Sequence, residues 1–345
     1  MSLFTLNVLP ADNSPYIGSG PFAVEIKNLD FSHLSITLNR FPSFYGQKPY
    51  LKKIILNFYP SLDEAADALR FKKIDGLGYL SPGKINPEEF NNYKYLSLPL
   101  PNFTAIFFNL HDEALFNSLD MRKVITTLTP TTKILELIGE KEALTAGEKE
   151  LYNPKVATSL LEKNGWKKDK DGVWLKNKKK LEVSLTVVKN PTTQAIASLI
   201  LEEWKKFGLT TNLNVIDNQN LIPTIKDKKF QVILLGVFNL NFDPFYLWHS
   251  SQRDTGFNIS GFTSRRADEI LEKMQLTKDE NEKKALEQEF EKILEEKVAM
   301  IPLYRSEYNY LINQNVKGTH IVQLNYPEDR FNGVNNWYLT TKKSF

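Results

Sequence analysis

The sequence has no cysteine among its 345 residues, which excludes disulfide bonds, thiolate metal sites and cysteine nucleophiles and leaves the redox compartment undetermined. It has no run near the roughly 18 apolar residues that a membrane-spanning helix needs. The first residues lack the basic and apolar regions of a secretion signal. The two signs of charge are nearly balanced, since 44 basic and 41 acidic residues leave a net charge of only +3. The charge balance therefore requires neither nucleic acid nor an anionic membrane as partner.

The motifs of common enzyme classes are missing as well. There is no G-x-S-x-G elbow, no H-E-x-x-H helix and no Walker-type phosphate loop. The histidines are scattered without a partner three or four residues away, which favours surface or satisfied core roles over metal ligation. They are His33, His111, His249 and His320. We therefore expect no catalytic residue, no metal ligand and no cofactor.

Three short segments resemble ligand motifs and are better explained as turns. Gly18 to Gly20 looks like part of a phosphate loop, but Pro21 follows where a helix with free N–H groups should begin. Residues 169–172, DKDG, begin like a calcium loop, but the glycine comes too early and no glutamate closes the loop. Residues 176–180, KNKKK, have no interleaved aromatic residues, which is typical of a solvated hairpin tip.

The length and the pattern of apolar residues predict a two-domain α/β protein. A chain of 39.7 kDa with 41% hydrophobic and 25% charged residues is ordinary for a globular protein and too large for one simple core. Periodicity predicts strands and helices in alternation. The expected strands are 16–27, 33–41, 53–59, 75–80, 103–109, 209–216, 232–238 and the extended stretch 301–312, with a hairpin at 169–185. The expected helices are 63–71, with Asp63 as N-cap, 120–128, 154–164, 192–207, 264–274 and 279–299.

The stretch from Phe230 to Phe262 holds the strongest candidate site. Val232 to Phe238 is an uninterrupted apolar run, typical of a strand buried on both faces. Polar and aromatic residues follow it: Asn239, Asn241, Asp243, Tyr246, Trp248, His249, Arg253 and Asn258. Ligands of open α/β sheets bind beyond the carboxyl ends of strands, and aromatic walls with amide groups suit an extended small molecule or peptide. Two alternatives stay open: an ordinary surface loop, and aromatic rings that simply belong to the core.

Several segments, taken in order, resemble one family. They are YIGSGPFAVEIKN, then LNRFPSFYGQKPYLKKIILNFYP, then FFNLHDEALFNSLDMRKVITTL, then NPKVATSLLEKNGW, then DPFYLW with Asn258 and GFTSRRADEILEK, and finally IPLYRSEYNYLINQNVKG. Their order and spacing resemble the extracellular solute-binding proteins of family 5, the oligopeptide, dipeptide and nickel binders of ABC importers. Each motif is loose by itself, but together they span nearly the whole chain.

The resemblance implies a type II periplasmic-binding-protein fold, α/β with mixed sheets in two lobes that close on a ligand by hinge motion. The expected division is 1–102 for the remaining part of lobe one, 103–317 for a continuous lobe two, and 318–345 for a return to lobe one. Family members begin earlier than this chain does. We therefore expect lobe one to be incomplete, and the chain to be a C-terminal portion or a truncated product.

The resemblance also implies site residues. Peptide-binding members pair the backbone of the strand that corresponds to residues 236–238 with the peptide. They fix its amino group with an Asp at the position of Leu240, where this chain has no carboxylate. The expected ligand-binding residues are Gly236, Val237, Phe238, Asn239, Asn241, Asp243, Trp248 and Asn258.

The expected function is that of a non-catalytic substrate-binding protein of an ABC importer. It would bind a peptide or similar small solute between two lobes and deliver it to permease subunits. The expected location is the extracellular or periplasmic side of the envelope, through a lipid anchor that precedes this chain. The alternative is a degenerate member that acts as a sensory or protein-interaction module without transport, which Leu240 favours.

Overall fold

The computed structural model describes residues 20–27, 35–80, 85–111, 115–139, 152–238, 243–254, 256–321 and 324–340. The chain forms two compact units. Unit 1 comprises Met1–Leu100 and Glu307–Phe345, and unit 2 comprises Pro101–Ser306. The chain therefore enters unit 2 once and returns to unit 1 once.

Unit 2 is built on a five-stranded mixed sheet in the order β11-β10-β12-β6-β13. Its strands are β11 (Thr210–Ile216), β10 (Glu182–Val188), β12 (Val232–Phe238), β6 (Asn102–Phe108) and β13 (Met300–Tyr304). The pairs of β10 with β11 and β12 are parallel, whereas β6 runs antiparallel to β12 and β13. The sheet is mixed, as expected.

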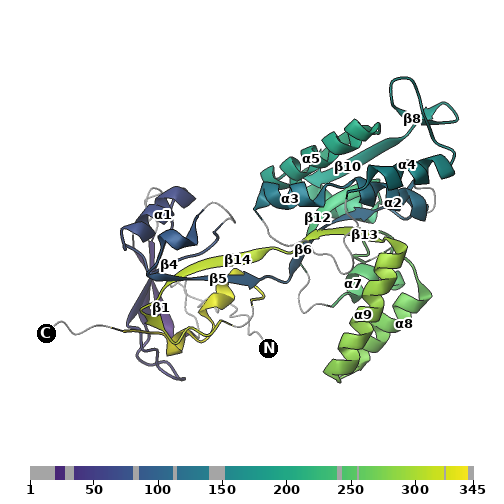
Figure 1. The fold of residues 1–345 in the computed structure, drawn as a ribbon. Coiled ribbons are helices and arrows are strands. Elements are labelled where there is room, and N and C mark those ends of the chain that lie inside the picture. The colour runs from purple at the N-terminus through teal and green to yellow at the C-terminus, as the bar shows by residue number, and fades with distance from the viewer. Residues whose placement is uncertain are drawn as a thin grey trace. The chain divides into compact units, whose positions relative to one another are not determined.

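Helices cover both faces of this sheet (Figure 1). One face carries α2 (Leu119–Leu128), α3 (Thr131–Ile138), α4 (Pro154–Lys163) and α5 (Pro191–Phe207). The other carries α7 (Phe245–Trp248), α8 (Arg265–Leu276) and α9 (Glu280–Lys297), and the short α6 (Leu221–Lys226) contributes Ile225 to the same core.

The central strand β12 supplies both cores because successive side chains point to opposite faces. Val232 and Leu234 belong to the core under α5, and Ile233 and Leu235 to the core under α8 and α9. The predicted two-sided burial is thus confirmed for the first part of the strand. Its last three residues, from Gly236 to Phe238, emerge from the core.

Local side chains and a glycine fix several helix ends. Asn153 and Asp279 accept backbone N–H groups at the starts of α4 and α9, and Gly208 ends α5 with φ 106°. The predicted cap Asp63 is wrong, because α1 (Leu62–Arg70) begins earlier and Ser61 accepts the Glu64 N–H. Asp63 lies in the first turn, where its charge favours the helix dipole.

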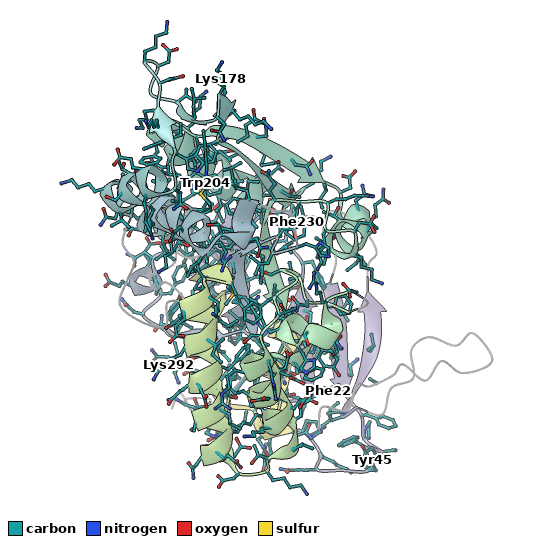
Figure 2. The ribbon with its side chains drawn as sticks, turned by 90° about the vertical axis from the view of Figure 1, so that its right-hand side faces the viewer. Phe22, Tyr45, Lys178, Trp204, Phe230 and Lys292 are labelled. Atoms are coloured by element: carbon teal, nitrogen blue, oxygen red, sulfur yellow. The ribbon has the colours of Figure 1, made fainter. Side chains whose placement is uncertain are left out.

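The lysine-rich segment forms a small three-stranded sheet of β7 (Lys167–Lys168), β8 (Trp174–Lys176) and β9 (Lys179–Lys180). The DKDG sequence is the turn between β7 and β8, where Asp169 Oδ1 accepts the N–H groups of Asp171 and Val173 at 2.9 Å each. Lys178 lies at the exposed tip between β8 and β9 (Figure 2). Both segments are turns, as predicted.

Unit 1 contains two three-stranded sheets. The first is an antiparallel meander of β1 (Phe22–Lys27), β2 (Ser35–Arg40) and β3 (Lys53–Asn57). The second has the order β4-β14-β5, with β4 (Gly76–Leu77), β14 (Glu307–Asn313) and β5 (Tyr93–Pro99). Unit 1 also contains a short antiparallel pair of strands, β15 (Val316–Lys317) with β16 (Tyr338–Leu339).

The extended stretch predicted over 301–312 is two strands that belong to different units. β13 pairs with β6 in unit 2, whereas β14 pairs with β5 and β4 in unit 1. The return to unit 1 therefore begins at Glu307 and not at residue 318. Hydrophobic pattern alone cannot show this division, because both strands are apolar and only their pairing partners differ.

Candidate functional site

Among the residues that the structure describes, the carboxyl end of β12 is bordered by strand on one side only. The pairing with β10 ends at Val187↔Leu234, whereas the pairing with β6 continues to Asn102↔Phe238. Gly236 is exposed, and the ring of Phe238 is 44% exposed. The sheet thus presents a short open strand edge beyond the end of β10.

The ladder shows which way the backbone of Gly236 points. Asn109 N–H donates to Gln231 O at 2.9 Å, so the polar backbone groups of residue 231 face β6. Backbone groups alternate in direction along a strand. Residues 233, 235 and 237 therefore also face β6, and Gly236 directs its N–H and C=O to the side that β10 no longer occupies.

The space at Gly236 is open. A Cβ added there would have Thr104 Oγ1 as its only close neighbour outside the adjacent residues, at 3.7 Å. The fold of unit 2 therefore does not require glycine at this position for packing. Its absent side chain leaves the sheet face beside the open edge uncovered.

Asn239, Leu240 and Asn241 lie outside the described residues. Asp243, the nearest carboxylate beyond them, is half-buried and engaged locally. Its Oδ1 accepts the Phe245 N–H at 2.9 Å and fixes the start of α7, and its Oδ2 accepts from Gln275 Nε2 at 3.5 Å. Asp243 thus positions the segment that follows the strand.

Trp248 is a core residue in the structure. It is 3% exposed, and its ring lies 6.0 Å from the ring of Phe107 and 5.9 Å from that of Phe262. At this position the structure shows the alternative that the sequence left open: the ring packs in the core and does not form the expected aromatic wall.

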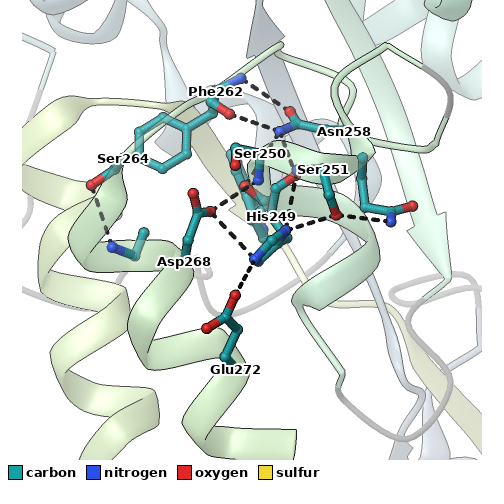
Figure 3. Close-up of polar contacts among 11 residues, drawn as sticks. His249, Ser250, Ser251, Asn258, Phe262, Ser264, Asp268 and Glu272 are labelled. Carbon is teal, nitrogen blue, oxygen red and sulfur yellow. Dashed lines mark hydrogen bonds and ion pairs between the residues drawn. The ribbon is translucent and has the colours of Figure 1, made fainter.

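Asn258 is fully buried and serves the backbone of its own loop (Figure 3). Its Nδ2 donates to the carbonyl oxygens of Trp248 and His249, both at 3.3 Å, and of Phe262 at 2.8 Å. Its Oδ1 accepts the Phe262 N–H at 3.0 Å. Both Nδ2 hydrogens are used by backbone carbonyl groups and the side chain is 0% exposed, so Asn258 positions its own loop.

His249 fastens the same loop to α8 (Figure 3). Its Nδ1 accepts the Ser251 N–H at 3.1 Å, which places the proton of the neutral ring on Nε2. Nε2 lies 3.4 Å from Glu272 Oε1 and 4.0 Å from Asp268 Oδ1, and Phe245 stacks on the ring at 4.3 Å. Asp268 Oδ1 also accepts the Ser250 N–H at 2.9 Å. The loop after β12 is thereby held on a rigid helix.

One residue beside the open edge was not predicted. Asn102 starts β6 opposite Phe238, and its buried Oδ1 has no hydrogen-bond partner among the described residues. A buried acceptor without a donor is costly, so such an atom is suited to a donor from outside. The sequence did contain a signal for it. Asn102 is an amide directly before the predicted strand 103–109, as Asn239 is directly after the predicted strand 232–238.

Metal clusters and membrane-spanning helices are absent from the residues that the structure describes. The described residues contain no group of three or more histidine, aspartate or glutamate side chains that could hold a metal ion. None of the helices in the described part of the chain is long and apolar enough to cross a bilayer. Two surface hollows, of about 190 Å³ in unit 1 and about 460 Å³ in unit 2, are lined by residues away from the end of β12.

Comparison with known proteins gives a family match over most of the chain. Residues 8–258 match the model of the bacterial extracellular solute-binding proteins, family 5 Middle. The oligopeptide-binding protein AppA of Bacillus subtilis is 24% identical over 346 residues, which cover 94% of this chain and 62% of that protein. The dipeptide-binding protein of Escherichia coli is 18% identical over 322 residues, which cover 88% of this chain and 58% of that protein.

The fold is also found among solved structures. The crystal structure of NikA from Brucella suis in complex with Fe(III)-EDTA matches with a TM-score of 0.73 at 18% identity, covering 94% of this chain and 68% of NikA. The chain thus has the fold of periplasmic binding proteins. It spans about three-fifths of the length of the two curated relatives.

Proposed function

Because the chain belongs to the bacterial extracellular solute-binding proteins of family 5, we propose that it is the substrate-binding component of an ABC importer and that its ligand is a peptide. The observation that carries this proposal is the open end of β12, where Gly236 directs its backbone groups away from β6. Two relatives named for oligopeptide and dipeptide binding support the ligand class. The protein binds and releases its ligand without catalysis.

Peptide binding at this edge is strand addition. An extended peptide pairs its backbone with Gly236, where β10 has stopped, and so continues the sheet. Backbone pairing reads no side chains, and the exposed ring of Phe238 gives an apolar surface beside it. The unpartnered Asn102 Oδ1 is an acceptor for a peptide N–H at the same end of the sheet. Gly236, Val237 and Phe238, with Asn102 added, form the binding edge we propose.

This edge binds the amino group of the peptide only weakly. Leu240 stands at the position where the family resemblance implies an anchoring Asp, and Asp243 already accepts the Phe245 N–H. Asn239 and Asn241 can accept from an ammonium group but cannot neutralise its charge. Losing a charged partner in a desolvated site typically costs about 2–5 kcal/mol. We therefore propose a ligand whose amino terminus contributes little to its affinity.

The site of action is the outer side of the cytoplasmic membrane, where the family's solute-binding proteins act. A lipid anchor in a longer form of the protein would hold it near the permease.

Thermal unfolding with peptide pools tests the proposal. A ligand at about 100 times its Kd stabilises the chain by about 2.7 kcal/mol, which shifts the midpoint measurably. We expect a pool of free peptides and the same pool N-acetylated to give similar shifts. A shift with free peptides only would show that the ammonium group is read, and no shift with either pool would contradict peptide binding.

A pair of glycine variants ties any shift to the open edge. Gly236→Pro removes the N–H that points to the open edge and should strongly reduce the shift. Gly20→Pro is the matched control, because it makes the same change in unit 1, where an added Cβ has nothing within 4 Å, and it should keep the shift. Equal shifts in both variants would place the ligand elsewhere.

A further inference from the structure

The edge strand β11 of the unit 2 sheet differs from the other edge strands in the described part of the chain. Natural edge strands are protected against pairing by lysine, proline, bulges or short length. Here β4, β15 and β16 have two residues each. The remaining edges carry lysine or proline: Lys27 in β1, Lys53 in β3, Lys94 and Pro99 in β5, Lys167 and Lys168 in β7, Lys179 and Lys180 in β9, and Pro302 in β13.

β11 has none of these devices. Its sequence, TTNLNVI, contains no charge and no proline in a chain with 25% charged residues. It pairs with β10 without a bulge from Glu182↔Thr210 to Val188↔Ile216. Leu213 and Val215 are each 40% exposed, and Asn212 and Asn214 beside them are exposed as well. The opposite edge of the same sheet, β13, is broken by Pro302 and a register shift.

The ladder shows which backbone groups of β11 face outward. Thr210 N–H donates to Leu181 O at 3.0 Å, and Ile216 O accepts the Lys189 N–H at 2.8 Å. Residues 210, 212, 214 and 216 therefore face β10, because direction alternates along a strand. Thr211, Leu213 and Val215 direct their N–H and C=O groups to the open side.

We propose that β11 pairs antiparallel with β11 of a second copy of this chain, about a two-fold axis at Leu213. In this register Leu213 lies opposite its own copy, and Thr211 lies opposite Val215 of the partner. Both are pairs whose backbone groups point at each other, so every outward N–H and C=O of the three residues is satisfied. Asn212 lies opposite Asn214 of the partner, and no like charges meet.

Charges at the two ends of the strand are complementary in the same register. Continuing the pairing places Asp217 of the partner beside Leu209, at the hollow of about 460 Å³. Lys168, Lys205 and Lys206 line that hollow, with Asp171 as its acidic member. Lys168 Nζ is held over the rings of Trp174 and Phe207, at 5.2 and 4.9 Å. Asp217 makes no ion pair among the described residues, so its carboxylate is suited to this hollow.

A second copy is favoured over a foreign strand because one register satisfies the outward backbone groups of Thr211, Leu213 and Val215 and also brings Asp217 of the partner to the lysine-lined hollow. One strand from each copy makes a small interface, so the dimer is expected to be weak and to grow with protein concentration. The proposal does not rest on peptide binding, because β11 is an edge of the sheet separated from β12 by β10.

Sedimentation of charge variants at Leu213 tests the register. The wild-type chain should show a monomer–dimer equilibrium, and Leu213→Lys and Leu213→Glu should each be monomeric because like charges meet at the axis. An equimolar mixture of the two variants should dimerise again. Asn212→Lys is the matched control: it adds the same charge one residue away, opposite Asn214, and should keep dimerisation. Circular dichroism confirms that each variant is folded.

Two results would overturn the proposal. The first is a wild-type chain that stays monomeric up to about 1 mM. The second is a dimer that Leu213→Lys leaves intact or that the mixed variants fail to restore. Amide hydrogen exchange gives an independent reading: raising the protein concentration should slow exchange at Thr211, Leu213 and Val215, and should leave Asn212 and Asn214 unchanged.

Discussion

The guanidinium group of Arg122 binds the carbonyl oxygen of Lys297 with two nitrogens, Nε at 3.0 Å and Nη2 at 2.6 Å. This contact joins the start of α2 to the last residue of α9, on elements 175 residues apart. Nη1 also donates to Phe116 O at 2.6 Å and to Asn117 O at 3.0 Å. Burial lowers the pKa of Arg122, and no carboxylate contributes to that shift. The residue holds unit 2 together through backbone carbonyls alone.

Replacing Arg122 should therefore destabilise unit 2. We expect Arg122→Met to lower the free energy of unfolding by about 2–4 kcal/mol, because buried carbonyl oxygens lose charged donors. Urea unfolding followed by tryptophan fluorescence measures the loss. Arg122→Lys keeps the charge but not the planar fork and should recover only part of it. A change within about 0.5 kcal/mol for Arg122→Met would contradict this role.

Asn258 should be intolerant even of an isosteric change. Asn258→Asp removes the Nδ2 donor and turns an oxygen toward the carbonyl oxygens of Trp248, His249 and Phe262. We expect a loss of about 2–4 kcal/mol in unfolding free energy. Asn218→Asp, at an exposed position of the same unit, is the control and should change stability little. Similar stabilities of the two variants would show that the loop does not depend on this amide.

The sequence reveals local patterns and does not reveal contacts between distant segments. Apolar runs and helical periodicity predicted β12, α4, α5 and α9 closely, because both are local patterns. The burial of Trp248 against Phe107, the division between β13 and β14, and the helices α3, α6 and α7 were not predicted. Each depends on which distant segment packs against the residue, and local pattern contains no such information. The unpaired end of β12 likewise follows from where β10 stops, which only the ladder shows.

Glu203 should contribute acid-sensitive stability. Its side chain is 6% exposed and lies 2.9 Å from Lys133 Nζ and 3.3 Å from Lys206 Nζ. The hydrogen bond from Lys133, together with those from Lys206 and Tyr152, holds the pKa of Glu203 below its usual value, against the opposing effect of burial. The folded state thus favours the carboxylate. The stability that this carboxylate contributes is present above the pKa of Glu203 in the unfolded chain, about 4.3. It is lost as pH falls through the pKa of Glu203 in the folded protein.

Comparing Glu203→Gln with wild type across pH tests this. The stability difference should be largest near neutral pH and should shrink as pH falls below about 4.3. Glu202→Gln is the matched control, because Glu202 also contacts Lys206 but is 61% exposed. It should show little difference at any pH. A pH-independent difference for Glu203→Gln would mean that lost packing, and not charge, is responsible.

Unit 1 should lose stability at high pH through its buried tyrosines. Burial raises the pKa of Tyr310 to about 12, and burial also raises the pKa of Tyr308 beside it. The folded state favours the neutral phenols. The stability that these phenols contribute is complete below the tyrosine pKa of the unfolded chain, about 10. It is lost as pH rises from there through the raised pKa values of the folded protein.

Tyr310→Phe should flatten the loss of stability between about pH 10 and pH 12. Circular dichroism follows unfolding, and absorbance near 295 nm follows tyrosinate. Tyr45, which is 85% exposed, supplies the control as Tyr45→Phe, and its curve should match that of the wild type. An unchanged slope in Tyr310→Phe would show that this phenol does not set the alkaline limit.

Amide hydrogen exchange at Gly236, measured with and without a peptide pool, tests the central claim most directly. The account predicts that peptide slows exchange of the Gly236 N–H, which points to the open side, while the N–H of Val237 is unaffected because β6 already pairs with it. Binding that leaves Gly236 exchange unchanged would contradict strand addition at β12.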